Sequence, residues 1–257
     1  MSKPVPFVNL SGHRIEYQDI PAARAGLPAL IVLHEGLGSL ALWRDFPANL
    51  AAATGCRTVT YSRRGYGKSA PMTAARKVDY MHREALEDLP ALRAAFDLEN
   101  PILVGHSDGG SIALIHAGTG KWPVRALVLE APHVFVEDIS IQGIAQAKVD
   151  YDQGELRRRL GRYHDDVDHA FRGWDDVWLS PEFRSWNIEE FLAGISCPIL
   201  AIQGRDDQYG TLKQLDAIEA RVKGPFERLV LDRCGHSPHR DQEKSVREAM
   251  ARFIARV

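Results

Sequence analysis

The stretch VGHSDGG, residues 104–110, joins two segments of different periodicity. Residues 101–106 (PILVGH) form a short apolar run that predicts a buried strand, and residues 108–118 have the pattern of a helix. At the junction, Ser107 has a glycine two positions before it and another two positions after it. This is the G-x-S-x-G pattern of a nucleophile elbow, whose sharp turn presents the serine above the sheet, near the positive end of the helix. The alternative, a chance Gly-Ser turn, does not account for both flanks.

A serine hydroxyl needs a general base, and the chain offers candidates after later predicted strands. His236 lies in CGHSPHRD, in a loop between a predicted strand and the last predicted helix. Asp206 and Asp207 follow the predicted strand 198–203. Either carboxylate could orient the imidazole of His236 and stabilise its protonated form.

The rest of the chain alternates strand-like and helix-like segments, which predicts a mostly parallel sheet flanked by helices. The predicted strands are a lead-in hairpin at 5–10 and 13–20, followed by residues 29–34, 57–62, 101–106, 125–131, 198–203 and 226–232. The predicted helices are residues 42–54, 79–96, 108–118, 211–222 and 240–256. We expect a kink or break at Pro90, because proline has no N–H to donate.

Residues 132–192 interrupt this alternation, because they contain no convincing strand and carry three of the five tryptophans. A helical insertion between two strands of an α/β sheet is typical of a lid over a site at the carboxyl ends of the strands. We predict a lid at 132–192, inserted in a core made of residues 1–131 and 193–257. Most of its aromatic side chains are expected to form the lid's own small core.

Composition excludes several classes of function. The 257 residues suit one sizeable domain, and the net charge of -2 gives no reason to expect nucleic acid or an anionic membrane as a partner. No apolar run approaches the ~18–20 residues that span a bilayer, and the N-terminus has no apolar region typical of a signal peptide. Three widely separated cysteines indicate reduced thiols. We expect a cytoplasmic monomer or homodimer that acts on a small molecule.

The ten histidines form no convincing metal-ligand motif. HEGLG lacks the second histidine of a zinc protease, and RGYGKS has too few residues between its glycines for a nucleotide-binding loop. We therefore expect no metal and no cofactor. His34 and His106 are expected to support the two loops from behind the site.

Several segments together resemble the α/β-hydrolase superfamily over nearly the whole chain. LHEGLGS (33–39) with Trp43 resembles the family's HG-x-x-x-S loop, and SRRGYGKS (62–69) resembles its R-G-x-G-x-S segment. GHSDGG, GRDDQYG and CGHSPHRD resemble its nucleophile, acid and histidine loops. The resemblance implies the α/β-hydrolase fold, with a mostly parallel central sheet and a helical lid.

The resemblance also implies site residues. Serine, acid and histidine follow one another in the family's order, with Ser107 as nucleophile and His236 as base. The acid is the fourth residue of G-x-x-D, which selects Asp207, although the proline that follows it in the family is absent here. The implied oxyanion hole combines the backbone N–H groups of Asp108 and Gly36, with Leu37 as the alternative to Gly36.

Glu35 stands where the family usually has a glycine. One interpretation is that its carboxylate turns away from the site and forms an ion pair with Arg63 or Arg64. The other places Glu35 in the pocket beside the oxyanion hole. There it would repel anionic substrates, favour a cationic or hydrogen-bond-donating group, or position water for deacylation.

We expect a serine hydrolase that cleaves a small to medium carboxylic ester, lactone or thioester through an acyl-serine intermediate. The predicted pocket residues are Glu35, Leu37, His133, Trp174 and Trp178. Serine at the nucleophile position argues against the dehalogenase and epoxide-hydrolase branches of the family, which use aspartate. The alternatives are a C–C bond hydrolase of dienoic ketoacids, which Glu35 and Asp108 disfavour, a ligand receptor that retains the fold, and a lyase.

Overall fold

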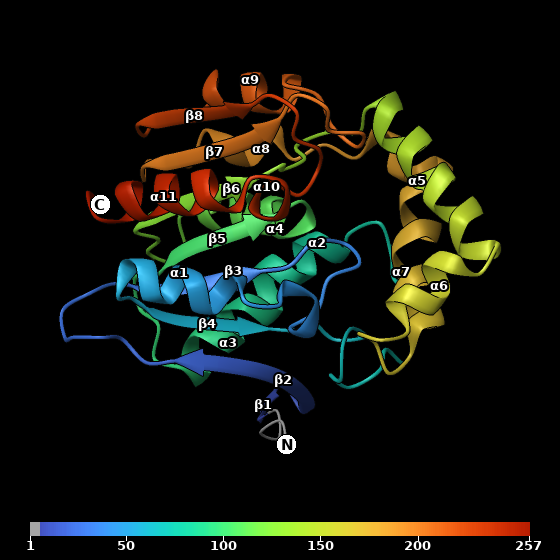
Figure 1. Ribbon diagram of the computed structural model, residues 1–257, viewed down its shortest axis with the longest axis horizontal. Coiled ribbons are helices and arrows are strands. Elements are labelled where there is room, and N and C mark those ends of the chain that lie inside the picture. The colour runs from blue at the N-terminus through green and yellow to red at the C-terminus, as the bar shows by residue number, and fades with distance from the viewer. Residues whose placement is uncertain (1–5) are drawn as a thin grey trace.

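One eight-stranded sheet organises the protein, whose computed structural model describes residues 6–257 (Figure 1). Val5, the first residue of the predicted strand 5–10, lies outside the described residues. The strands are β1 (Phe7–Leu10), β2 (His13–Ile20), β3 (Ala29–Leu33), β4 (Arg57–Tyr61), β5 (Ile102–His106), β6 (Ala126–Glu130), β7 (Ile199–Gly204) and β8 (Phe226–Leu231). Their order is β1-β2-β4-β3-β5-β6-β7-β8, antiparallel up to the β2–β4 pair and parallel beyond it. The predicted fold class is confirmed.

The central strands are buried along their whole length because helices cover both faces of the sheet. Successive side chains point to opposite faces, so that Ile31 and Leu33 enter one apolar cluster while Leu30 and Val32 enter the other. The register pairs His106 at the end of β5 with Glu130 at the end of β6. The loops that follow these strands therefore start at the same end of the sheet, where the carboxyl ends of the parallel strands lie.

The helices that flank the sheet follow the predicted segments closely. They are α1 (Phe46–Thr54), α2 (Tyr80–Arg83), α3 (Leu89–Ala95), α4 (Asp108–Gly118), α9 (Lys213–Glu219), α10 (Pro238–Asp241) and α11 (Glu243–Ile254), with a 3-10 turn, η1, at Ala41–Trp43. A π-helical turn, η2 (Glu84–Asp88), separates α2 from α3. The break that we expected at Pro90 therefore lies in the turn just before the proline, which itself is the second residue of α3.

Between β6 and β7 the chain forms a helical insertion, most of which stands beyond the carboxyl ends of the central strands (Figure 1). Its helices are α5 (Asp138–Asp152), α6 (Glu155–Leu160), α7 (Val167–Trp178), η3 (Pro181–Ser185) and α8 (Glu189–Leu192), of which α8 packs on α4. Its aromatic side chains Phe171, Trp178 and Phe183 belong to the same apolar cluster as Leu33 and Leu103 of the sheet. The rings of the insertion also stack on one another, as expected for a small lid core, so that this core is continuous with the apolar cluster of the sheet.

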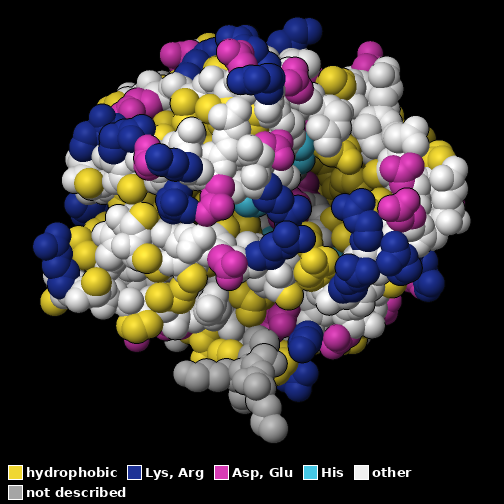
Figure 2. Space-filling model, viewed as in Figure 1, with side chains coloured by type: hydrophobic (Ala, Val, Ile, Leu, Met, Phe, Trp, Pro, Cys, Tyr) yellow, Lys and Arg dark blue, Asp and Glu magenta, His cyan; other side chains and the backbone are white. Residues whose placement is uncertain are grey.

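Within residues 6–257, no helix combines the length and the apolar character needed to cross a lipid bilayer. Lysine, arginine and acidic side chains are interspersed on the face in Figure 2, and apolar atoms are visible in the hollow between the sheet and the insertion. This hollow leads to the candidate site.

Candidate active site

Ser107 occupies the sharp turn between β5 and α4. Its backbone has φ 52° and ψ -118°, a conformation that a residue with a side chain rarely adopts. The two flanking glycines explain how the turn closes. A Cβ on Gly105 would lie 2.3 Å from the carbonyl oxygen of Gly109, and one on Gly109 would lie 2.1 Å from that of Leu33. The turn places the Ser107 side chain in a pocket at the carboxyl edge of the sheet.

His236 and Asp207 meet in the loops after β8 and β7. The Nδ1 atom of His236 lies 2.9 Å from both carboxylate oxygens of Asp207. That carboxylate also accepts hydrogen bonds from the backbone N–H of Tyr209 at 2.8 Å and from Nε2 of Gln203 at 2.6 Å. Burial raises the pKa of Asp207, but His236 and the Tyr209 N–H outweigh it and hold the pKa below its usual value. Asp206, the other candidate acid, is exposed.

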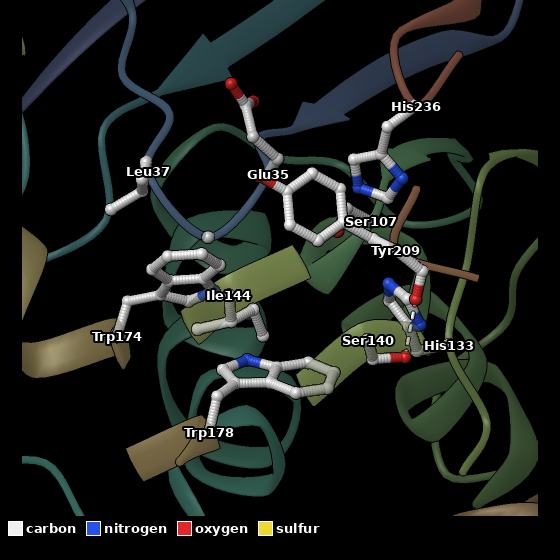
Figure 3. Close-up of a pocket in the computed structure, with 11 residues that line it drawn as sticks. Glu35, Leu37, Ser107, His133, Ser140, Ile144, Trp174, Trp178, Tyr209 and His236 are labelled. Carbon is white, nitrogen blue, oxygen red and sulfur yellow. Dashed lines mark hydrogen bonds between the residues drawn. The ribbon is translucent and has the colours of Figure 1, made fainter. Parts of the chain in front are cut away.

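A cavity joins these loops to the helical insertion (Figure 3). Its lining residues are Glu35, Gly36, Leu37, Ser107, His133, Ser140, Ile144, Trp174, Trp178, Tyr209 and His236. The structure thus brings the predicted nucleophile, the predicted base and every predicted pocket residue to one cavity.

Three of the lining residues were not predicted from the sequence. Ser140 and Ile144 stand one turn apart on α5, as Trp174 and Trp178 do on α7. The four-residue spacing of Ser140 and Ile144 could have indicated that they share one face of a helix. It could not show that this face of α5 meets the site. Tyr209 follows the acid by two residues, and its ring packs edge-on against His236 with centroids 4.8 Å apart.

The predicted oxyanion donors come from two segments, the loop after β3 and the start of α4. The backbone N–H groups of Gly36, Leu37 and Asp108 find no acceptor among residues 6–257 and are therefore free to bind a ligand. The Asp108 N–H begins α4. Gly36 lies under the indole of Trp174, since a Cβ on Gly36 would be 2.2 Å from Nε1 of that tryptophan.

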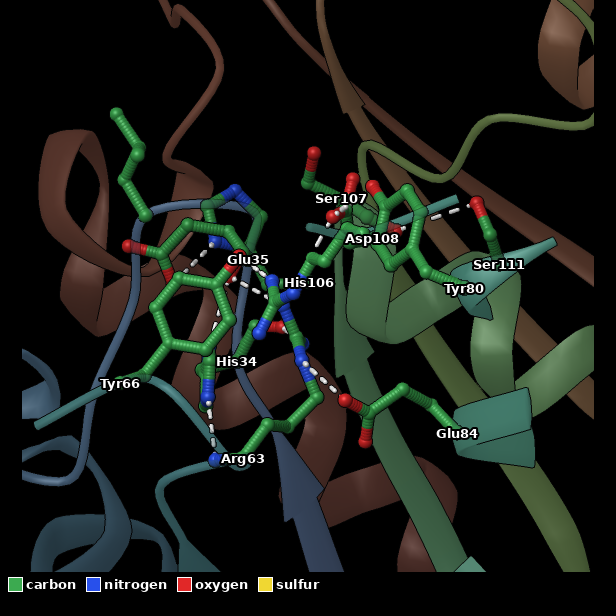
Figure 4. Close-up of polar contacts among 12 residues, drawn as sticks. His34, Glu35, Arg63, Tyr66, Tyr80, Glu84, His106, Ser107, Asp108 and Ser111 are labelled. Atoms are coloured by element: carbon green, nitrogen blue, oxygen red, sulfur yellow. Dashed lines mark hydrogen bonds and ion pairs between the residues drawn. The ribbon is translucent and has the colours of Figure 1, made fainter. Parts of the chain in front are cut away.

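The carboxylate of Asp108 is buried and does not line the cavity. It accepts a hydrogen bond from Tyr80 Oη at 2.5 Å and lies 3.8 Å from Nη2 of Arg63 (Figure 4). Tyr80 Oη in turn accepts a hydrogen bond from the Trp178 indole at 3.1 Å. Burial raises the pKa of the Asp108 carboxyl, and Arg63 and Tyr80 oppose that rise. The negative charge that would oppose an oxyanion is therefore paired behind the site.

Glu35 has a different partner from the one that we expected. Its Oε2 lies 3.6 Å from Nδ1 of His106, whereas Arg63 donates to the backbone carbonyl of Glu35 and Arg64 bonds elsewhere. The predicted side-chain ion pair with Arg63 or Arg64 is therefore wrong. The reason is that the buried guanidinium of Arg63 donates its hydrogen bonds to main-chain carbonyl oxygens.

Glu35 combines features of both interpretations. It lines the cavity, yet its carboxylate, 18% exposed, is directed away from the indole rings (Figure 3). Burial raises the pKa of Glu35, but His106 outweighs it and the pKa lies well below its usual value. His106 donates from Nε2 to the carbonyl oxygen of His236 at 2.6 Å, so this pair supports the histidine loop from behind.

His133, the remaining predicted pocket residue, follows β6 and is buried. Its ring packs edge-on against Trp178, with centroids 5.2 Å apart. Burial, with the neighbouring His236, lowers the pKa of His133 to about 3, so the imidazole is neutral. No group of three or more His, Cys, Asp or Glu side chains within residues 6–257 is arranged to hold a metal ion.

This chain belongs to the α/β-hydrolase family, because the sequence profile described as "Alpha/beta hydrolase family" matches residues 30–249. Among individual proteins, the mouse serine hydrolase BPHL is 27% identical over 224 residues, which cover 84% of this chain and 75% of the mouse protein. A 2-heptyl-3-hydroxy-4-quinolone dioxygenase (AqdC2) of Rhodococcus erythropolis is 35% identical, but over 107 residues that cover 42% of this chain and 37% of that protein.

Solved structures show the same fold. The 2-hydroxy-6-oxo-6-phenylhexa-2,4-dienoate hydrolase (BphD) of Rhodococcus sp. strain RHA1 superposes with a TM-score of 0.81, covering 99% of this chain and 100% of that one at 17% identity. At 17% identity, this similarity shows the fold alone. The reaction has to be inferred from the residues of the site.

Proposed function

We propose that the protein is a serine hydrolase that cleaves a small to medium carboxylic ester, lactone or thioester through an acyl-serine intermediate. One observation carries this proposal: Ser107, on a nucleophile elbow, and His236, paired with a buried Asp207, line the same cavity. A nucleophile, a base and an orienting acid are the three groups that acyl transfer to serine requires.

In the proposed reaction, His236 accepts the hydroxyl proton as Ser107 Oγ attacks the substrate carbonyl carbon. The N–H groups of Asp108 and Gly36, or Leu37 in its place, stabilise the oxyanion. The tetrahedral intermediate collapses, and the leaving group takes the proton from His236. Water then attacks the acyl-serine with His236 as base, which releases the acid and restores Ser107. Asp207 stabilises the imidazolium in both steps.

The C–C bond hydrolase of dienoic ketoacids is the nearest alternative. Such a substrate carries a carboxylate that needs a cationic partner in a desolvated pocket. Among the lining residues of the described chain, none is a lysine or an arginine. The lining therefore supports the ester, lactone or thioester over the ketoacid.

Steady-state hydrolysis of p-nitrophenyl acetate, a lactone and a thioester tests the proposal on wild type and Ser107→Ala. We expect turnover of at least one substrate class by the wild type, and a loss of about 10³-fold or more in the variant. Turnover that survives in Ser107→Ala would contradict the proposal. Absence of turnover, combined with a large rise in Tm on ligand binding, would instead indicate a receptor.

A further inference from the structure

The cavity has an aromatic and uncharged wall opposite the nucleophile. Trp174 and Trp178 project from consecutive turns of α7, and Ile144 from α5 lies beside them (Figure 3). The ring of Tyr209 lies near His236 on the other side. Flat aromatic surfaces make their largest contact with planar groups, through offset stacking or edge-to-face packing.

The charges around the cavity disfavour an anionic substrate. Glu35 is an acid at its edge, Asp207 is an acid behind His236, and His133 is neutral. The buried cation Arg63 does not line the cavity and is already bonded to two carbonyls and close to Asp108. A carboxylate entering the cavity would lose its water without gaining a cationic partner.

Resting on the proposed hydrolase function, we propose that the substrate carries an uncharged, planar acyl group, as in a neutral aryl or conjugated acyl ester or thioester. The planar group lies against Trp174 and Trp178 while its carbonyl faces Ser107. Selectivity follows from the absence of a counter-ion together with the acid at Glu35, and not from size alone.

The test uses esters that share a leaving group and differ in one property. We expect kcat/KM to be at least about 100-fold higher for p-nitrophenyl benzoate than for mono-p-nitrophenyl terephthalate, which adds one carboxylate to the same ring. We expect p-nitrophenyl cyclohexanecarboxylate, which is neutral but not planar, to be about 10-fold slower than the benzoate.

Ile144→Arg supplies the missing cation from the wall of the cavity. This variant should raise kcat/KM for the terephthalate ester and lower it for the benzoate. The ratio of kcat/KM for the benzoate to that for the terephthalate ester should therefore fall by about 10-fold or more. Val149→Arg is the matched control, because Val149 lies on the same helix, is 47% exposed and does not line the cavity. It should leave the ratio unchanged.

Two failures can be told apart. The substrate class would be overturned if the wild type hydrolysed the terephthalate ester as fast as the benzoate. It would also be overturned if the cyclohexanecarboxylate ester were hydrolysed as fast as the benzoate. In both cases the serine hydrolase function would still stand. No turnover of any ester, together with no covalent labelling of Ser107, would overturn the function itself.

A second, independent inference concerns Arg63, which is 1% exposed and joins two parts of the site (Figure 4). Its Nη1 donates to the carbonyl oxygen of His34, and its Nη2 donates to that of Glu35 at 3.1 Å. The same Nη2 lies 3.8 Å from the Asp108 carboxylate. Arg63 therefore touches the loop that carries Gly36 and the residue that follows Ser107.

Planarity of the peptide bond gives these contacts a consequence. The carbonyl of Glu35 and the N–H of Gly36 belong to one trans peptide and point in opposite directions. Arg63 holds this carbonyl together with His34 Nδ1 at 2.7 Å and the Gly38 N–H at 3.1 Å. With the carbonyl held toward Arg63, the Gly36 N–H points away from it. On the other side, the pull on Asp108 fixes the first turn of α4, where the Asp108 N–H lies.

We infer that Arg63 is the positioning residue for both donors of the proposed oxyanion hole. It acts through the main chain and does not touch substrate. Tyr80 assists on one side, because it donates to the same Asp108 carboxylate.

Arg63→Lys keeps the charge but cannot span both carbonyls and the carboxylate. We expect kcat to fall about 100-fold with KM changed less than about 3-fold, because the lost interaction is strongest in the transition state. Affinity for phenylboronic acid, which forms a tetrahedral adduct with an activated serine, should fall in parallel with kcat/KM. Arg64→Lys is the matched control, since Arg64 bonds to Pro71 and Thr73 on the exposed side.

Tyr80→Phe tests the same inference with less risk to folding. It removes the hydrogen bond to Asp108, together with the one that Tyr80 accepts from the Trp178 indole, and should lower kcat and boronic acid affinity together by about 3- to 10-fold. A folded Arg63→Lys that keeps its kcat and its boronic acid affinity would overturn the inference. If Arg63→Lys does not fold, an unchanged kcat in Tyr80→Phe would overturn it instead.

Discussion

Asp206 and Asp207 are neighbours with opposite surroundings. Asp207 is buried against His236, while Asp206 is exposed. We predict that Asp207→Asn lowers kcat by about 10³- to 10⁴-fold, because an amide cannot stabilise the imidazolium and favours the wrong tautomer. Asp206→Asn should stay within about twofold of wild type. Ester hydrolysis measured on both variants would contradict the assignment if Asp206→Asn were the more damaged enzyme.

Glu35 lies between the cavity and His106. We predict that Glu35→Gln raises the kcat/KM of anionic relative to neutral esters by several-fold, because an acid leaves the edge of the pocket. The unfolding free energy should change less than the substrate preference does, because the glutamine oxygen can still accept a hydrogen bond from His106. Hydrolysis of neutral, cationic and anionic esters by wild type and Glu35→Gln measures the preference, and urea unfolding of both proteins measures the stability. An unaltered preference would leave Glu35 with a structural role alone.

At the residue scale, the sequence could identify groups that sit in short motifs. Ser107 and His236 were predicted from their positions after strands, and the family resemblance selected Asp207 over Asp206. The structure brings these three residues to one site. The surroundings of Arg63 and Glu35 could not be predicted in this way. Both depend on where main-chain carbonyls point, and charge pairing along the sequence carries no information about that.

At the scale of elements, α7 and the loop after β3 meet at Gly36. A methyl group there would lie 2.2 Å from Nε1 of Trp174, so Gly36→Ala must displace the indole or the loop. We predict a loss of about 10²-fold or more in kcat/KM, because a shift of an ångström misplaces the oxyanion donor. Gly173→Ala is the control, since its added Cβ would meet Arg76 Cδ at an ordinary 3.4 Å.

The control should keep wild-type activity and gain about 0.5–1 kcal/mol of stability, as expected for alanine inside a helix. Thermal unfolding and ester kinetics on both variants check the pair. Full activity in Gly36→Ala would show that the contact between α7 and this loop is dispensable.

Strands and flanking helices were predictable because apolar residues recur along each of them with a single clear period. The π-helical turn at Glu84–Asp88 was not, since the sequence marks only the proline after it and not the turn that absorbs the missing hydrogen bond. The continuity between the aromatic core of the insertion and the apolar cluster of the sheet was also missed. Contacts between segments far apart in sequence leave no local periodicity to read.

At the scale of the whole molecule, a buried histidine links stability to pH. In His116, Nδ1 donates to the carbonyl oxygen of Ala85 at 2.7 Å, and Nε2 lies 2.8 Å from Nη1 of Arg93. Burial lowers the pKa of His116 from its usual value near 6.5 to about 4. Between these values the unfolded chain binds a proton that the folded protein does not, so stability falls as pH falls.

We predict that this histidine removes about 1–3 kcal/mol from the unfolding free energy between pH 6.5 and 4. His116→Gln cannot titrate, so its unfolding free energy should fall less steeply than that of wild type across this window. Above pH 7 the difference between the two proteins should be constant. Urea unfolding at a series of pH values measures both, and equal slopes would contradict the prediction.

The fold as a whole was predictable because motifs at the ends of several strands must share one edge of a parallel sheet. The shape of the cavity was not, because it depends on how α5 and α7 face the sheet. The lid boundaries of 132–192 and the roles of the individual site residues stay predictions, which the variants above address.

The central claim is an activated Ser107. Intact-mass spectrometry after a fluorophosphonate probe, on wild type and Ser107→Ala, tests it most directly. We expect a single adduct on the wild type, mapped to Ser107, and none on the variant. A wild-type protein that forms no adduct, or a variant that is labelled equally, would contradict the proposed site.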